Sequence, residues 1–193
     1  MSARILAAVV LSICTVGATT AAPPRDWLLT GSNPKAYRVS VDDNVVYSGR
    51  PSALLASVSD SANGFGTLMQ SSEASLFRSK RLKFSAYVRS RDVTGWAGLW
   101  LRVDAEELPV RRTLAFDNMQ DRPIKGDSEW LPYSVVLDVP QAARTIAYGV
   151  LLAGPGRVWL AGAKFEVVDQ DVPTTGRFMS TQLPEPSNLN FEQ

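Results

Sequence analysis

The feature that most constrains the fold is a series of short runs of aliphatic and aromatic residues, separated by clusters of glycine, proline, asparagine, aspartate and serine. Such runs are typical of β-strands bounded by turns. They predict ten strands, near residues 37–41, 45–47, 52–58, 66–71, 82–91, 98–104, 113–117, 133–139, 145–152 and 158–168. Turns are predicted at 48–49, 63–64, 123–126 and 154–156, and a helical turn only within 73–80. The sequence therefore predicts an all-β fold, an antiparallel β-sandwich of two stacked sheets.

Two of the predicted strands alternate strictly, which assigns their side chains to opposite faces. In residues 82–89 the apolar side chains share one face, and Tyr87 and Arg89 lie on the other. In residues 97–104 the same alternation leaves Trp100 and Arg102 opposite the apolar set. If these two strands pair with each other, the four residues share a polar face with two aromatic rings. We expect a shallow ligand cleft there.

The N-terminus has the pattern of an export signal. Arg4 is followed by the apolar run 5–16, then by small residues ahead of Pro23, and cleavage after Ala18 or Ala21 fits this pattern. A membrane-spanning helix needs roughly 20 apolar residues, so a permanent anchor is disfavoured. Residues 1–21 are therefore predicted to be a signal peptide of a periplasmic or secreted bacterial protein. The alternative is a lipoprotein acylated on Cys14, although the bulky Ile13 precedes that cysteine.

The composition excludes several classes of chemistry. The chain has no histidine, and Cys14, its one cysteine, lies in the predicted signal. Imidazole bases, thiolate nucleophiles, histidine or thiolate zinc sites and disulfides are therefore excluded from the mature part. Lys+Arg number 20 and Asp+Glu 19, so the protein is close to neutral and lacks the basic surface that nucleic-acid binding needs.

The order of several segments resembles a known fold family. The segments are YRVSVDDNVVYSGRPSALL, FGTLMQS, RLKFSAYVRSRDVTGWAGLWLRVD and EWLPYSVVLDVPQAARTIAYGVLLAGPGRVWLAGAKFEVV. Together they resemble the galactose-binding-like jelly roll of the carbohydrate-binding-module type across most of residues 27–170. The resemblance implies a jelly-roll β-sandwich over residues 22–170 that binds a carbohydrate or another small polar ligand.

Two further segments, LAFDNMQDRPIKG and GLWLRVD, are similar to uncharacterised bacterial proteins. Some of those proteins are described as transcriptional regulators through an attached helix-turn-helix domain. These residues contain no helical pattern of that kind, so we do not expect the regulator description to apply here.

Aromatic rings stack on the C–H faces of sugars, and planar polar groups bind the hydroxyls. By this criterion the candidate ligand-binding residues are Trp100, Arg102, Tyr87, Arg89, Trp96, Gln70, Asp117 and Asn118. Each has a purely structural alternative. Trp100 can pack under a loop, Arg102 or Arg89 can pair with Asp104, and Asp117 with Asn118 can close a turn.

The resembled family often holds a structural calcium ion with acidic residues of its last strand. Residues 159–163 carry no carboxylate, so we expect no cofactor and no calcium site of that kind. Asp42 and Asp43 are the remaining oxygen ligands for a weak site, or else they only form a turn. The loop that starts at Asp117 is not an EF-hand, because Arg122 and Ser128 replace its glycine and glutamate.

Residues 171–193 change in composition and are predicted to be a proline- and threonine-rich tail. Residues 188–192 resemble the first strand of the jelly-roll family, so the tail either folds back to supply that strand or links to another domain.

Three functions remain open at this stage. The first is an exported, non-catalytic module that binds a carbohydrate or small polar ligand. The second is a structural or protein-interaction β-sandwich. The third is a hydrolase that uses carboxylates alone, with Asp104, Glu106, Glu107 and Asp117 as candidates. No catalytic motif is present, so we expect no enzymatic activity.

Overall fold

A computed structural model describes residues 22–107 and 110–176, and the predicted signal segment 1–21 lies outside this range. The described residues form nine strands and one short 3-10 helix, η1 (Pro34–Ala36). The strands are β1 (Leu28–Gly31), β2 (Tyr37–Tyr47), β3 (Arg50–Ser57), β4 (Phe65–Glu73), β5 (Lys80–Glu107), β6 (Val110–Asp117), β7 (Ile124–Val139), β8 (Thr145–Ala153) and β9 (Arg157–Val168). All pairings are antiparallel.

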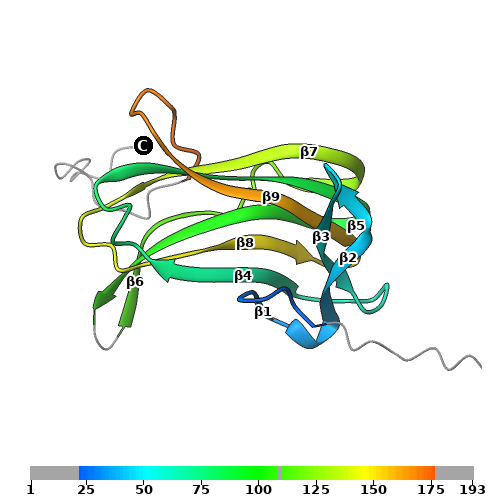
Figure 1. Cartoon of the computed structure of the whole chain (residues 1–193). Coiled ribbons are helices and arrows are strands. Elements are labelled where there is room, and N and C mark those ends of the chain that lie inside the picture. Colours follow the sequence, from blue (N-terminus) through cyan, green and yellow to red (C-terminus); the bar gives the residue numbers. More distant parts are fainter. Residues whose placement is uncertain (1–21, 108–109, 177–193) are drawn as a thin grey trace, which may run out of the picture.

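The 28-residue strand β5 belongs to both layers of the sandwich. Its first half pairs with β7 on one side and β9 on the other, from Arg81 onward. Its second half pairs with β8 and β6, from Trp96 onward. The first layer therefore runs β2-β3-β9-β5-β7 and the second runs β1-β4-β8-β5-β6 (Figure 1). The predicted all-β sandwich is confirmed.

The core lies between the two layers and follows the predicted alternation. Leu82, Phe84 and Val88 from the first half of β5 are fully buried, as are the leucines at positions 99 and 101 of its second half. Apolar side chains of β4, β7, β8 and β9 complete the same cluster. Burial of this cluster is the main term that stabilises the two layers against each other.

The predicted strand boundaries differ from the structure in several places. Strand β7 begins at Ile124, nine residues before the predicted start at 133, so the predicted turn at 123–126 is wrong. Predicted strands 82–91 and 98–104 are one strand, because the backbone bends between the layers through register shifts in its pairing with β7 without leaving the sheet. Predicted strands 37–41 and 45–47 also merge, into β2, with a register shift between Asp42 and Tyr47. Strand β1 was missed because its four residues, LLTG, show no alternation.

The predicted turn at 48–49 is confirmed, whereas the predicted helical turn within 73–80 differs from the structure. Ser48 and Gly49 both have positive φ and join β2 to β3 in a two-residue hairpin, as predicted. Residues 74–79 form successive hydrogen-bonded turns, Phe77 N to Ala74 O at 2.9 Å and Lys80 N to Phe77 O at 3.1 Å, rather than a regular helix. Within the described residues no helix is long and apolar enough to cross a membrane.

Residues 170–176 return along the open edge between β6 and β7. Arg81 donates from one Nη to the carbonyls of Gln170 and Val172, at 2.7 Å each. Thr175 bonds Val136 of β7 through its backbone N–H, at 2.9 Å, and Val136 donates back to the Thr175 hydroxyl at 2.8 Å. This start of the tail is therefore part of the domain, whereas segment 188–192 lies outside the described residues.

Candidate functional site

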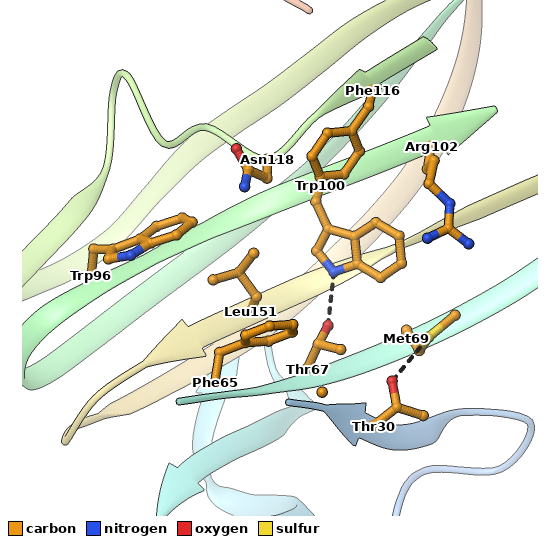
Figure 2. A pocket seen from close by; sticks show the side chains of 11 residues that line it. Thr30, Phe65, Thr67, Met69, Trp96, Trp100, Arg102, Phe116, Asn118 and Leu151 are labelled. Atoms are coloured by element: carbon orange, nitrogen blue, oxygen red, sulfur yellow. Dashed lines mark hydrogen bonds between the residues drawn. The ribbon is translucent and has the colours of Figure 1, made fainter. Parts of the chain in front are cut away.

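A groove crosses the outward face of the second layer and is lined by residues of five strands and of the loop after β6. We call it the Trp100 groove. Its cavity volume is about 420 Å³, and its lining residues are Thr30, Gly31, Phe65, Thr67, Met69, Trp96, Trp100, Arg102, Phe116, Asn118 and Leu151 (Figure 2). This size lies within the usual range for small-molecule sites.

The floor of the groove is Trp100, which is only 7% exposed. Its indole Nε1 donates to Thr67 Oγ1 at 2.7 Å, and that hydroxyl donates in turn to the carbonyl of Val150 at 2.9 Å. The ring packs in a small cluster with Ala147 and Leu151. Because its only polar atom is satisfied inside the protein, Trp100 is a rigid surface rather than a hydrogen-bonding group.

Aromatic rings from three different strands surround this floor. Trp96 precedes Trp100 on β5, Phe65 begins β4, and Phe116 is near the end of β6. Figure 2 shows Trp96 at one end of the groove, with Leu151 between it and Trp100 and with Phe65 beside Leu151. Phe65 is 38% exposed, which leaves much of its ring available for contact. The walls are therefore apolar, planar and accessible.

Polar groups lie at two positions of the groove. Arg102, at the end opposite Trp96 in Figure 2, donates from Nε to Asp104 Oδ2 at 2.9 Å. Asp104 is 1% exposed and also accepts from the Thr113 hydroxyl at 3.0 Å. Asn118 uses its side-chain oxygen to accept the Gln120 N–H at 3.1 Å, and its amide nitrogen points toward the groove. Both side chains are thus oriented by a second contact while they line the groove.

Four of the eight predicted site residues meet in this groove: Trp96, Trp100, Arg102 and Asn118. The expectation that Tyr87 and Arg89 share their face is wrong. They lie on the first half of β5, which belongs to the other layer, so residues of one strand end up on opposite sides of the sandwich.

Gln70 and Asp117 also lie outside the groove. Gln70 accepts the Tyr148 hydroxyl at 2.5 Å, on the side of β4 that faces the core. Asp117 is 7% exposed, caps the Met119 N–H at 2.8 Å and forms an ion pair with Arg122 at 2.5 Å. The turn-closing alternative describes Asp117 correctly.

Sequence reasoning missed the groove residues of β1, β4, β6 and β8. Their shared feature is that they occupy alternate positions facing Trp100, and they are Thr30, Phe65, Thr67, Met69, Phe116 and Leu151. The alternation in FGTLM was available as a signal for the β4 members. What the sequence lacked was the pairing of strands more than 80 positions apart, such as Thr67 with Leu151.

Two of the four carboxylates considered for hydrolysis are held in ion pairs. Asp104 and Asp117 are buried and hold the arginines at 102 and 122 in ion pairs. The side chains of Glu106 and Glu107 lie outside the described residues. The groove's lining among the described residues includes no carboxylate, whereas glycoside hydrolysis requires a pair of them.

Asp42, a candidate calcium ligand, is used for structure on the first layer. Its Oδ1 accepts the N–H groups of Asn44 and Val45 at 3.0 Å each, and its Oδ2 accepts the Trp159 indole N–H at 2.8 Å. Burial alone would raise the pKa of Asp42, but the hydrogen bonds from Trp159, Val45 and Asn44 outweigh it and lower the pKa. Among the described residues no three acidic, histidine or cysteine side chains are grouped for a metal ion.

Comparison of the sequence with models of protein families finds no match. The chain is 40% identical over 171 residues to the Bacillus subtilis protein named Uncharacterized HTH-type transcriptional regulator YbfP. That alignment covers 88% of this chain and 57% of the relative, so the chain spans little more than half of the relative's length.

Among solved structures, the chain is similar to the CBM22-1 xylan-binding domain of Paenibacillus barcinonensis Xyn10C. The TM-score is 0.54 at 15% identity, with 77% of this chain and 90% of that domain covered. It is also similar to the CBM22-1 and GH10 modules of Clostridium thermocellum xylanase 10B, with a TM-score of 0.53, 11% identity, and coverage of 74% and 26%. At this level of identity the similarity establishes the fold, which is the β-sandwich of carbohydrate-binding modules.

Proposed function

We propose that this chain is a non-catalytic binding module that holds a carbohydrate in the Trp100 groove. The observation that carries the proposal is the combination of aromatic walls at Trp96 and Phe65 with the donors of Arg102 and Asn118 at the groove's other positions. Aromatic faces bind the C–H faces of a pyranose ring, and fixed planar donors select the arrangement of its hydroxyls.

Three further points support this function. The groove's lining extends over residues of five strands, which suits a chain of sugar units better than a small pocket on one strand does. The solved structures with the same fold include domains named for xylan binding. Asp104 and Asp117, the two buried carboxylates among the catalytic candidates, are already held in ion pairs, which favours ligand binding without hydrolysis.

We further propose that the protein acts in the periplasm or outside the cell, after removal of residues 1–21. The support is the charged, apolar and small-residue pattern of that segment. The partner is then a polysaccharide met outside the cytoplasm. A fusion of residues 1–30 to a reporter that is active only after export tests this part: an inactive reporter contradicts it.

The test of the groove is a panel of soluble oligosaccharides added to the purified chain, with thermal unfolding as the readout. A ligand at 100 times its dissociation constant stabilises the folded state by about 2.7 kcal/mol, which gives a saturable rise in unfolding temperature. Trp96→Ala should weaken that binding about tenfold or more, because it removes an aromatic contact worth at least about 1.4 kcal/mol.

Trp130→Ala is the matched control, since Trp130 is also half-buried but lies on the other layer. Equal losses in the two variants would contradict the groove as the site. A flat response to the whole panel would favour the structural or protein-interaction sandwich instead.

A further inference from the structure

A second cavity lies on the outward face of the first layer, on the opposite side of the sandwich from the Trp100 groove. Its volume is about 370 Å³, and it is lined by residues of β5, β7 and β9: Lys83, Ser85, Ala86, Tyr87, Pro132, Tyr133, Ser134, Gly162 and Lys164. These three strands lie side by side in Figure 1. We call this cavity the Lys164 cavity.

Two ammonium groups converge on one carboxylate beside this cavity. Glu166 Oε2 lies 3.2 Å from Lys164 Nζ and 4.0 Å from Lys83 Nζ. Two positive charges against one negative charge leave a net charge of +1 at this point. A ligand group with one negative charge would neutralise this net charge, whereas a group with two negative charges would exceed it.

An unsatisfied polar atom lies at the same place. Ser85 Oγ is buried and makes no hydrogen bond with any described residue. Ser85 pairs across the sheet with Lys164 on one side and Ser134 on the other, and all three residues line the cavity. Buried polar atoms normally have partners, so the Ser85 hydroxyl marks where a ligand oxygen would bind.

The remaining walls of the cavity are planar and rigid. The Tyr87 ring stacks on Tyr47 with centroids 4.2 Å apart and an interplanar angle of 26°. Gly162 has a φ of +59° and lies against both rings, since a Cβ there would be 3.4 Å from Tyr87 and 3.8 Å from Tyr47. Tyr87 is thus held in one orientation beside Pro132, and these two side chains form an apolar wall for a ring.

We propose that the Lys164 cavity binds an acidic sugar, with its ring against Tyr87 and Pro132 and its carboxylate between the two lysines and Ser85. The net charge of +1 selects one carboxylate, the wall selects a ring, and the hydroxyls of Ser85 and Ser134 bind its oxygens. This site is separate from the Trp100 groove and does not depend on the function proposed for it.

The test is an NMR titration of the full chain with galacturonic acid, in parallel with its uncharged methyl ester. Amide shifts of Ser85, Tyr87 and Lys164 should saturate with the acid, and the ester should bind about fivefold or more weakly, which is the scale of one exposed ion pair. Raising the salt concentration should weaken binding of the acid but not binding of the ester.

The variants give effects of opposite sign. Lys164→Met should weaken binding of the acid several-fold, and Glu166→Gln should strengthen it, because the net charge rises to +2. Lys125→Met, at an exposed lysine of β7 outside the cavity, should change nothing. A gain in affinity cannot come from damage to the fold, so Glu166→Gln separates the proposal from a structural effect.

Three results would overturn the proposal: equal binding of acid and ester, no gain in Glu166→Gln, or inorganic phosphate binding as well as the sugar acid. Trp96→Ala should leave the titration of the Lys164 cavity unchanged. The proposals for the two sites can therefore be tested independently of each other.

Discussion

The five tryptophans of this chain serve different purposes, and burial distinguishes them better than sequence does. Trp100 is 7% exposed with its N–H bonded inside the protein, whereas Trp96 is half-buried at the end of the same groove. Trp159 is 6% exposed and is fixed by Asp42 on the other layer. Of these three rings, only the accessible ring of Trp96 can be removed without disturbing the sheet beneath it.

We therefore expect Trp100→Ala to lower the free energy of unfolding by about 3–5 kcal/mol, the usual cost of deleting a buried aromatic ring. Trp96→Ala should lower it by about 1 kcal/mol or less while it weakens ligand binding. Urea unfolding of both variants measures this difference. Equal destabilisation would mean that Trp96 is also a packing residue.

The Asp42 carboxylate gives a pH dependence at the scale of one residue. Its pKa is lower in the folded state than the ordinary value of 3.8, so its stabilising effect is complete above that value and is lost as the pH falls through the folded pKa. Asp42→Asn should therefore flatten the loss of stability between about pH 5 and pH 2. Thermal unfolding across this range checks it, and an unchanged slope would contradict it.

At the scale of elements, the sequence predicts where strands lie better than how they continue. The alternation of residues 82–88 and 97–103 is correct residue by residue, because period two depends only on local geometry and burial. The continuity of β5 is not local. It depends on β7 and β9 pairing with the first half and β8 and β6 with the second, and no property of the strand itself specifies those partners.

The same reason explains which part of the groove could be predicted. Trp96, Trp100 and Arg102 share one strand face and could be grouped from their spacing alone. Phe65, Thr67 and Phe116 reach them only through strand order. Tyr87 and Arg89 were wrongly added because β5 bends from one layer into the other. The outward faces of its two halves therefore lie on opposite sides of the sandwich.

The contact between β5 and the loop after β6 gives an element-scale prediction. A Cβ on Gly98 would lie 2.6 Å from the carbonyl oxygen of Asn118 and 3.0 Å from Met119 Cβ. Gly98→Ala should therefore push this loop away from β5, displace Asn118 and weaken binding in the Trp100 groove. Ligand titration checks the loss, with amide shifts of residues 117–120 as evidence of the movement. Retained affinity would show that Asn118 does not contact the ligand.

At the scale of the whole molecule, the start of the tail connects the two layers. Arg81 of β5 bonds the carbonyls of residues 170 and 172 and also pairs with Asp138 of β7 at 2.8 Å. Gly176 lies against both layers, because a Cβ there would be 2.2 Å from Leu137 of β7 and 2.8 Å from the Phe116 carbonyl of β6. The edge of the sandwich is therefore closed by residues beyond its last strand.

A chain ending at Asp169 should lose a few kcal/mol of stability, since several hydrogen bonds at about 0.5–1.5 kcal/mol each disappear with the closed edge. A chain ending at Gly176 keeps these contacts. If its unfolding temperature matches that of the full chain, segment 188–192 does not supply a strand. If the unfolding temperature falls, the fold-back hypothesis gains support.

The order of the strands also determines when this protein can fold. Every neighbour of β5 in both layers follows it in the chain, and the last of them, β9, ends at Val168. A growing polypeptide that has reached residue 107 therefore holds its longest strand without a single partner. The first half of β5 can bond one neighbour once β7 has emerged, and it gains the other only with β9. We expect slow refolding dominated by these long-range pairings, and a period during synthesis when the unpaired strand must be kept from aggregating.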